Sequence, residues 1–387
     1  MNESAEPLSI KDWLTQLLSF DTTSRESNLA LIFTIKAYLE SLGIEPTLIY
    51  NKEETKANLY ARFGPEGNGG VMLSGHTDVV PVDGQDWSYP PFQLTEHDGK
   101  CYGRGSADMK GFLACVLAAI PMFQKASLRM PLYLAFSYDE EVGCLGVRSL
   151  IEHLKASPEK PAMCIIGEPT NMLPVYGHKG KVAMRCDVTG HACHSAYAPE
   201  GVNAIEYAAK LINKLTELAE PLKNELDSRF DPPYSTLQTG VIKGGAALNI
   251  VPESCQFDIE MRYLPGTEAN ETFNHLQDYA QQTLVPQMQG VAEKANIEFK
   301  SLAQYPPLLT DPQSEFAQWL ASWSSCDSFQ TVAFGTEGGL FDEAGVATLV
   351  CGPGSMEQGH KPDEFVSIQQ LECCNLMLSN LCDWMKV

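Results

Sequence analysis

Apolar residues along the chain follow two spacings, one typical of helices and one of buried strands. Helical spacing covers 9–20 and 28–43, and Gly43 ends the second segment. Short, almost wholly apolar runs indicate buried strands at 71–75, 131–138, 161–167 and 346–352. Further helical segments lie between and after these runs, at 111–123, 145–155 and 367–385. This alternation predicts an α/β fold in three α/β/α layers, with a parallel-rich sheet covered by helices on both faces.

The middle of the chain has a different order. Strand patterns at 181–190, 235–245, 253–265 and 295–303 alternate with helical patterns at 202–222 and 271–288. The order β-α-β-β-α-β is typical of a ferredoxin-like α+β unit. Because the last strand and helix of the α/β pattern come only after this segment, we expect an inserted domain at 180–304. The remaining residues, 1–179 and 305–387, would then form one discontinuous domain.

Composition narrows the classes of partner. The chain has 387 residues, with 27 Lys and Arg against 49 Asp and Glu, so its formal net charge is −22. Phosphate binding needs clustered cations, so we expect no nucleic-acid partner and no anionic membrane partner. No apolar run approaches the about 18 residues of a membrane span, and the N-terminus lacks the pattern of a secretory signal. The twelve cysteines contain no C-x-x-C pair, which argues against a redox or zinc motif. Without an export signal, we expect them to be reduced thiols in the cytoplasm.

Acidic residues and histidines follow the predicted strands. His76 and Asp78 follow the first apolar run, Glu140 and Glu141 the second, Glu168 the third, and His360 comes shortly after the fourth. Asp108 directly precedes a predicted helix. In an open α/β sheet, ligands bind beyond the carboxyl ends of the strands, so these side chains are expected to converge.

Each of these residues alone has an ordinary explanation. A histidine after a strand is usually a loop residue, adjacent acids often form a solvated turn, and an aspartate before a helix can be an N-cap. Together they would repel one another unless cations compensate them. Two His and three carboxylates can hold two divalent ions, Zn or Co, if one carboxylate bridges them. Glu140 would then be free to act as a base, and Asp78 could orient the ring of His76.

Five segments carry a resemblance to a known family. SGHTDVVP, YGRGSADMKG, SYDEEVGCLG, IIGEPT and GPGSMEQGHKPDE resemble the motifs of the M20 metallopeptidase family, in order and spacing. The resemblance implies that His76 and Glu168 bind one metal ion, that Glu141 and His360 bind the other, and that Asp108 bridges them. It also implies that Glu140 is the general base and that the Asp108–Met109 peptide bond is cis.

The resemblance further implies a substrate class and an assembly. Within the family, the chain most resembles enzymes that remove the acetyl group of N-acetyl-L-ornithine in arginine biosynthesis. The inserted domain would then act as a lid and dimerisation domain. His194 would reach the active site of the second subunit of a homodimer, with His191 as its competitor for this role. Asn249 and Arg262 would line the site of a small N-acyl amino acid substrate.

Glu337 is a candidate for recognising the ammonium group of such a substrate. The segment 335–341 follows a short apolar strand and lies shortly before His360. The alternative is that Glu337 is a solvated loop acid or forms hydrogen bonds with its own loop. For the whole chain, the alternatives are another M20 deacylase or dipeptidase, such as an aminoacylase or a succinyl-diaminopimelate desuccinylase, and a non-catalytic acidic interaction protein.

Overall fold

A computed structural model describes residues 7–326 and 328–387, and the chain divides into two units. The first unit contains the residues up to Gly177 together with Leu308–Thr331 and Thr336–Val387. The second contains His178–Pro307 and Val332–Gly335. Within the described residues, no helix combines the length and apolar character needed to span a bilayer.

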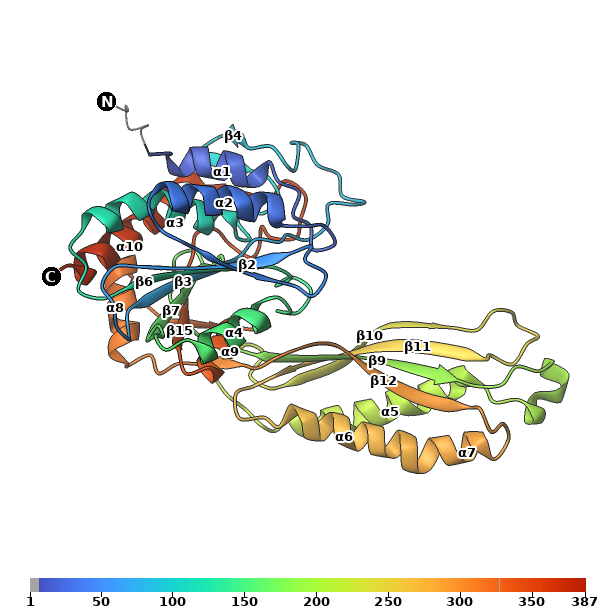
Figure 1. Ribbon diagram of the computed structural model, residues 1–387. Helices are drawn as coiled ribbons and strands as arrows, with labels where there is room; N and C mark the ends of the chain where they lie inside the picture. The colour runs from blue at the N-terminus through green and yellow to red at the C-terminus, as the bar shows by residue number, and fades with distance from the viewer. Residues whose placement is uncertain (1–6, 327) are drawn as a thin grey trace. The chain divides into compact units, whose positions relative to one another are not determined.

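A nine-stranded sheet forms the middle layer of the first unit (Figure 1). Its order is β1 (Thr47–Tyr50), β2 (Ala57–Phe63), β6 (Leu132–Ser137), β3 (Val71–His76), β7 (Met163–Ile166), β15 (Ala347–Val350), β8 (Val175–His178) and β13 (Leu308–Leu309), with β14 (Gln330–Val332) paired to β8. The central strands β6, β3, β7 and β15 are parallel to one another, whereas β2 pairs antiparallel with β6 and β8 pairs antiparallel with β15. Both faces of the central strands are buried, which explains why they appear in the sequence as continuous apolar runs.

Helices cover both faces of this sheet (Figure 1). One face carries α1 (Ile10–Leu18), α2 (Leu29–Ser41), α3 (Lys110–Lys125) and α10 (Ile368–Met385), and the other carries α4 (Val147–Ala156) and α9 (Gly338–Glu343). A further helix, α8 (Glu315–Ser324), packs against α10, with the rings of Trp319 and Trp384 4.7 Å apart. The predicted three-layer α/β/α architecture is therefore confirmed.

A small antiparallel sheet connects two distant segments of the first unit. It pairs β16 (Phe365–Ser367) with β5 (Lys100–Tyr102), and β5 with β4 (Thr95–His97). The sequence pattern did not predict it, because each strand has only three residues and partly exposed side chains. Its effect is to bring residues near position 103 next to residues near position 364.

The second unit has the predicted ferredoxin-like order. Its elements are β9 (Gly180–Thr189), α5 (Ala204–Leu222), β10 (Thr236–Gly244), β11 (Ser254–Tyr263), α6 (Ala269–Tyr279), α7 (Val285–Gln289) and β12 (Asn296–Tyr305). The antiparallel sheet has the order β10-β11-β9-β12, and the three helices cover one face of it (Figure 1). Alternate residues of β11 are buried, as expected for a sheet with one covered face.

The helix expected at 271–288 is interrupted. A π-helix, Ala280–Leu284, separates α6 from α7. Pro286 has no N–H group to donate to the carbonyl of Gln282, so the regular i to i−4 pattern cannot continue through this turn.

Candidate active site

The carboxyl ends of the four central parallel strands meet at one edge of the sheet, and the predicted residues lie there. His76 is the last residue of β3. Glu140 and Glu141 follow β6, Glu168 follows β7, and His360 lies in the loop between β15 and β16. Asp108 lies in the loop just before α3. The predicted convergence is therefore present in the first unit.

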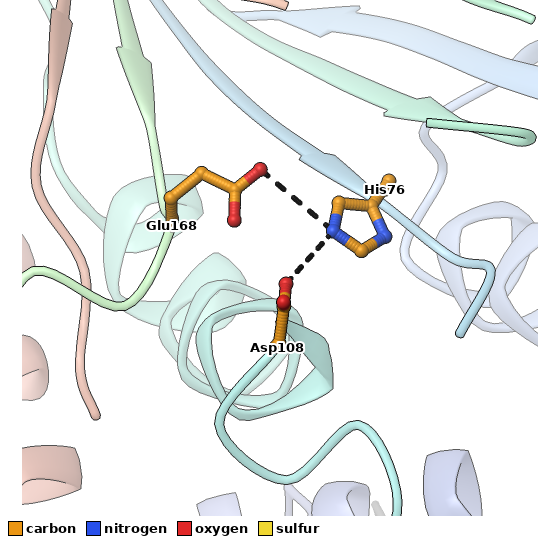
Figure 2. A group of neighbouring side chains, drawn as sticks. All are labelled: His76, Asp108 and Glu168. Carbon is orange, nitrogen blue, oxygen red and sulfur yellow. Dashed lines mark hydrogen bonds and ion pairs between the residues drawn. The ribbon is translucent and has the colours of Figure 1, made fainter. Parts of the chain in front are cut away.

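The first group of side chains consists of His76, Asp108 and Glu168, which point toward one another in Figure 2. The Nε2 atom of His76 lies 3.0 Å from Oδ1 of Asp108 and 3.7 Å from Oε1 of Glu168. All three side chains are at most 4% exposed. Gly167 permits this packing, because a Cβ at that position would lie only 1.9 Å from the ring of Phe112 on α3.

The second group shares Asp108 with the first. The Nε2 atom of His360 lies 3.3 Å from Oδ2 of Asp108 and 3.0 Å from Oε2 of Glu141. Asp108 therefore presents one oxygen to each imidazole. Glu141 is 6% exposed, whereas His360 is 51% exposed, so this group is open on the side of His360.

These two groups fit a pair of divalent cations. In each group, one potential ligand atom per residue lies within 4.8 Å of the others. The buried Oε1 of Glu141 has no hydrogen-bond partner among the described residues. Imidazole nitrogens and carboxylate oxygens are ligands that Zn and Co accept, and a shared carboxylate is what a cocatalytic pair about 3.5–4 Å apart requires. The peptide bond between Asp108 and Met109 is cis, as expected.

Electrostatics also favours cations at this site. Burial and the nearby charge of Asp108 raise the pKa of Glu168 well above its ordinary range. The same two causes raise the pKa of Glu141 to about 7. Burial opposes ionisation of Asp108 as well, but hydrogen bonds from His360 and His76 outweigh it and hold its pKa below the ordinary value. Positive charge among these carboxylates would stabilise all their ionised forms.

Asp78 connects this centre to the loop of Glu140. Its backbone oxygen lies 2.9 Å from Nδ1 of His76, whereas its carboxylate lies farther away, at 3.6 Å. The carboxylate instead accepts the N–H groups of Glu140 at 3.1 Å and Glu141 at 3.3 Å, and the hydroxyl of Ser24 at 2.7 Å. The backbone of Asp78 thus orients His76, and its side chain anchors the loop that follows β6.

Two further residues support this loop and were not found from the sequence. Cys144 donates its thiol to Oε1 of Glu140, with 3.4 Å between sulfur and oxygen. Lys56 forms a salt bridge of 2.6 Å with Asp139. Cys144 could have been noticed because it lies four residues after Glu140 in the same motif, whereas nothing in the sequence connects Lys56 with Asp139.

Glu337 lies in the first unit, just before α9, and is only 1% exposed. It is therefore not a solvated loop acid. Its Oε1 is buried without a hydrogen-bond partner among the described residues. Burial raises its pKa to about 7, and its charge is among those that raise the pKa of the Glu140 carboxyl, after burial and Glu141. A carboxyl group in this condition is suited to accept a cationic group.

The other predicted residues, His191, His194, Asn249 and Arg262, belong to the second unit. His194 is exposed, and its Nδ1 accepts the N–H of Ala196 at 3.1 Å. Asn249, also exposed, accepts the N–H of Ser195 through its backbone oxygen at 3.0 Å. The structure thus places His194 and Asn249 on neighbouring segments. His191 is exposed and pairs through its backbone with Val202.

Arg262, on β11, already has partners in the second unit. Its Nε lies 3.0 Å from Oε1 of Glu260, and its Nη1 donates to the hydroxyl of Tyr305 at 2.7 Å. A substrate carboxylate would have to share this guanidinium with Glu260. The role of Arg262 in binding a substrate stays a prediction.

Comparisons with known proteins identify the family of this chain. The model of peptidase family M20/M25/M40 matches residues 72–383. The chain is 35% identical over 367 residues to the acetylornithine deacetylase of Pasteurella multocida, covering 94% of this chain and 93% of that one. It is 36% identical over 381 residues to the acetylornithine deacetylase of Aliivibrio salmonicida, covering 96% and 97%.

A solved structure shows the same fold. An M20 family metallo-carboxypeptidase from Sulfolobus solfataricus superposes with a TM-score of 0.77 at 19% identity, covering 95% of this chain and 97% of that one. Because the family model spans most of the chain and the sequence relatives align over nearly its whole length, the chain belongs to peptidase family M20/M25/M40.

Proposed function

We propose that this chain is a dinuclear metal-dependent deacetylase that hydrolyses N-acetyl-L-ornithine to L-ornithine and acetate in arginine biosynthesis. The observation that carries the proposal is Asp108, which offers one oxygen to the group of His76 and the other to the group of His360. His76 and Glu168 would hold one ion, Glu141 and His360 the second, and Asp108 both. The ions would be Zn or Co.

The catalytic roles follow from the surroundings of each side chain. Divalent ions at these positions would polarise the amide carbonyl and lower the pKa of a water molecule. Glu140, which is not a member of either ligand group, would take a proton from that water and return it to the leaving amine. Asp78 would keep Glu140 in position through the loop backbone. His194 would donate a hydrogen bond to the oxygen that becomes negative in the transition state.

Substrate recognition would use both ends of acetylornithine. Arg262 would bind the carboxylate, with Asn249 beside the substrate, and Glu337 would bind the distal ammonium. The buried, unpartnered oxygen of Glu337 supports its role, because an ammonium group would supply both a hydrogen bond and a compensating charge.

The proposal includes an assembly and a location. A homodimer would allow His194 of one subunit to serve the metal centre of the other, and the second unit would act as the lid and dimerisation domain. The twelve cysteines are free thiols, which supports a reducing compartment such as the cytoplasm. The small N-acyl amino acid is then the substrate, and neither nucleic acid nor membrane is a partner.

A turnover panel tests the proposed reaction. Purified enzyme with added Zn or Co is offered N-acetylornithine, N-acetylmethionine, succinyl-diaminopimelate and a set of dipeptides. We expect the highest kcat/KM for N-acetylornithine. A clear preference for another substrate would assign the chain to a different M20 deacylase or dipeptidase, and no turnover of any substrate would favour the non-catalytic alternative.

The same panel tests Glu337. Glu337→Gln should raise KM for N-acetylornithine far more than for N-acetylmethionine, which has no ammonium group. The lost charge interaction should cost about 1–3 kcal/mol of discrimination, which is roughly 5- to 150-fold. An equal effect on both substrates would remove Glu337 from ammonium recognition and leave the deacetylase proposal in place.

A further inference from the structure

A buried carboxylate next to the centre binds the backbone of the shared ligand. Glu364, four residues after His360, is 1% exposed. Its Oε1 accepts the backbone N–H groups of Ala107 at 2.9 Å and of Asp108 at 3.0 Å. Its Oε2 accepts Nη1 of Arg104 at 2.6 Å. The carboxylate of Glu364 therefore fixes the main chain at Asp108.

Arg104 extends this network to the loop of His360. It is also 1% exposed, and its Nη1 donates to the backbone oxygen of Lys361 at 3.3 Å. Its Nη2 donates to Oε1 of Gln85 at 2.6 Å, and Nε2 of Gln85 donates to the backbone oxygen of His360 at 3.0 Å. The indole of Trp87 also donates to Gln85, and the guanidinium lies 5.0 Å from the centre of its ring. The network thus contacts the main chain of both ligand-bearing loops.

A contribution to folding stability does not explain why the Arg104–Glu364 ion pair is buried. Removing two charges from water costs free energy that their attraction often fails to recover, so a buried ion pair is weak evidence for stabilisation. A second Arg–Glu pair, Arg62–Glu159, also combines an ion pair with a hydrogen bond from a backbone N–H group. Glu159 accepts the N–H of Gly67 at 2.9 Å and forms an ion pair with Nε of Arg62 at 2.8 Å, but neither of these contacts reaches a ligand-bearing loop, and it is about one third exposed. Glu364 differs from Glu159 because it accepts backbone N–H groups of the loop that carries Asp108.

We infer that Glu364, Arg104 and Gln85 are positioning residues that set the distance between Asp108 and His360 and thereby the affinity of the centre for metal ions. The inference rests on the proposed dinuclear centre. Glu364 acts on Asp108, which both ions share, so its loss affects both. Gln85 donates directly to the backbone of His360 and reaches Asp108 only indirectly, through Arg104 and Glu364, so its loss affects the ion of His360 more than the other.

Metal titration of the full-length chain tests this inference. The chain is stripped with a chelator and titrated calorimetrically with Zn²⁺ and, separately, with Co²⁺. The wild type should bind two equivalents. Glu364→Gln should weaken both by 10- to 100-fold, as expected for the loss of a group that orients metal ligands. Gln85→Ala should weaken one equivalent by about 10-fold and the other by clearly less. Glu159→Gln, the matched control, should bind as the wild type does.

The outcomes separate the inference from the proposed function. Wild-type affinity in both Glu364→Gln and Gln85→Ala would overturn the inference while the two equivalents of the wild type uphold the dinuclear centre. An equal loss in Glu159→Gln would also overturn it, because the effect would then be general. A wild type that binds neither ion would overturn both. Gln85 is partly exposed and uncharged, so Gln85→Ala keeps the test decisive even if Glu364→Gln fails to fold.

Discussion

Glu140 and Glu141 are adjacent in the chain, yet their carboxylates have different neighbours. Oε2 of Glu141 lies 3.0 Å from Nε2 of His360, whereas Oε1 of Glu140 meets the thiol of Cys144. We therefore expect Glu140→Ala to retain two metal ions and to lose turnover by about 10²–10⁴-fold, as for a missing general base. Glu141→Ala should instead lose one of the two ions, because a ligand is removed.

Metal content measured by mass spectrometry beside kcat distinguishes these roles. The wild type, prepared with the same metal, gives the reference stoichiometry. The same metal loss in both variants would contradict the assignment of Glu140 as base and Glu141 as ligand.

The sequence could predict which side chains converge but not what holds them. His76, Glu141 and Glu168 follow apolar runs, and parallel strands deliver such positions to one edge of a sheet. Arg104 and Glu364 are 260 residues apart and meet only because two three-residue strands, β5 and β16, pair beside them. No local pattern encodes such a contact.

At the scale of elements, strands and helices with long apolar runs or faces could be predicted from the sequence, whereas the shortest elements could not. The four central strands and α1, α2, α3, α4 and α10 agree with their predicted segments because each has a strongly apolar run or face. β1, an edge strand with exposed ends, has no such run, and the two-residue β13 is too short to show a period. The π-helix before Pro286 shows how one missing donor can divide a helix whose apolar spacing is continuous.

His178, the last residue of β8, leads to a prediction about how the stability of the fold depends on pH. This side chain is fully buried, its Nδ1 lies 3.0 Å from the backbone oxygen of Lys179, and Nε2 has no partner among the described residues. Burial lowers the pKa of His178 to about 4. In the unfolded chain the same group binds its proton near pH 6.5. The free energy of unfolding should therefore fall by about 3 kcal/mol from this residue as the pH drops from 6.5 to 4.

Urea denaturation of the wild type and of His178→Asn at pH 7 and at pH 4.5 measures this contribution. Asparagine keeps a donor for the carbonyl of Lys179 but does not titrate. The variant should lose less stability between the two pH values than the wild type does, whatever its absolute stability. Equal losses would show that His178 is not responsible for the acid sensitivity.

At the scale of the whole molecule, the division of the chain depends on contacts that are remote in sequence. The short segment Val332–Gly335 belongs to the second unit although the residues on both sides of it belong to the first. Gly335 packs directly on the ring of Tyr305, where a Cβ would lie only 2.0 Å from a ring carbon. An absent side chain leaves no hydrophobic pattern, so this return of the chain could not be predicted from periodicity.

The proposed homodimer leads to a complementation experiment. If His194 serves the metal centre of the other subunit, then Glu140→Ala and His194→Ala chains, each inactive as a homodimer, should restore activity when mixed. In a mixed dimer, one centre combines an intact Glu140 with an intact His194 from the opposite chain, and the other centre has both defects. Random exchange of equal amounts makes half of the dimers mixed, so about a quarter of the wild-type activity should return.

Subunit exchange is verified independently, by mass spectrometry of differently tagged chains, and the hydrodynamic mass of the wild type must correspond to two subunits. If His194 instead served the metal centre of its own chain, an active centre would need both His194 and Glu140 intact in the same chain. No mixture of these two variants could then be active. Absence of complementation despite complete exchange would therefore place His194 at the centre of its own chain, whereas an active His194→Ala homodimer would place it outside catalysis. The amount of recovered activity measures the sharing of the site directly, because only the mixed dimers can contribute to it.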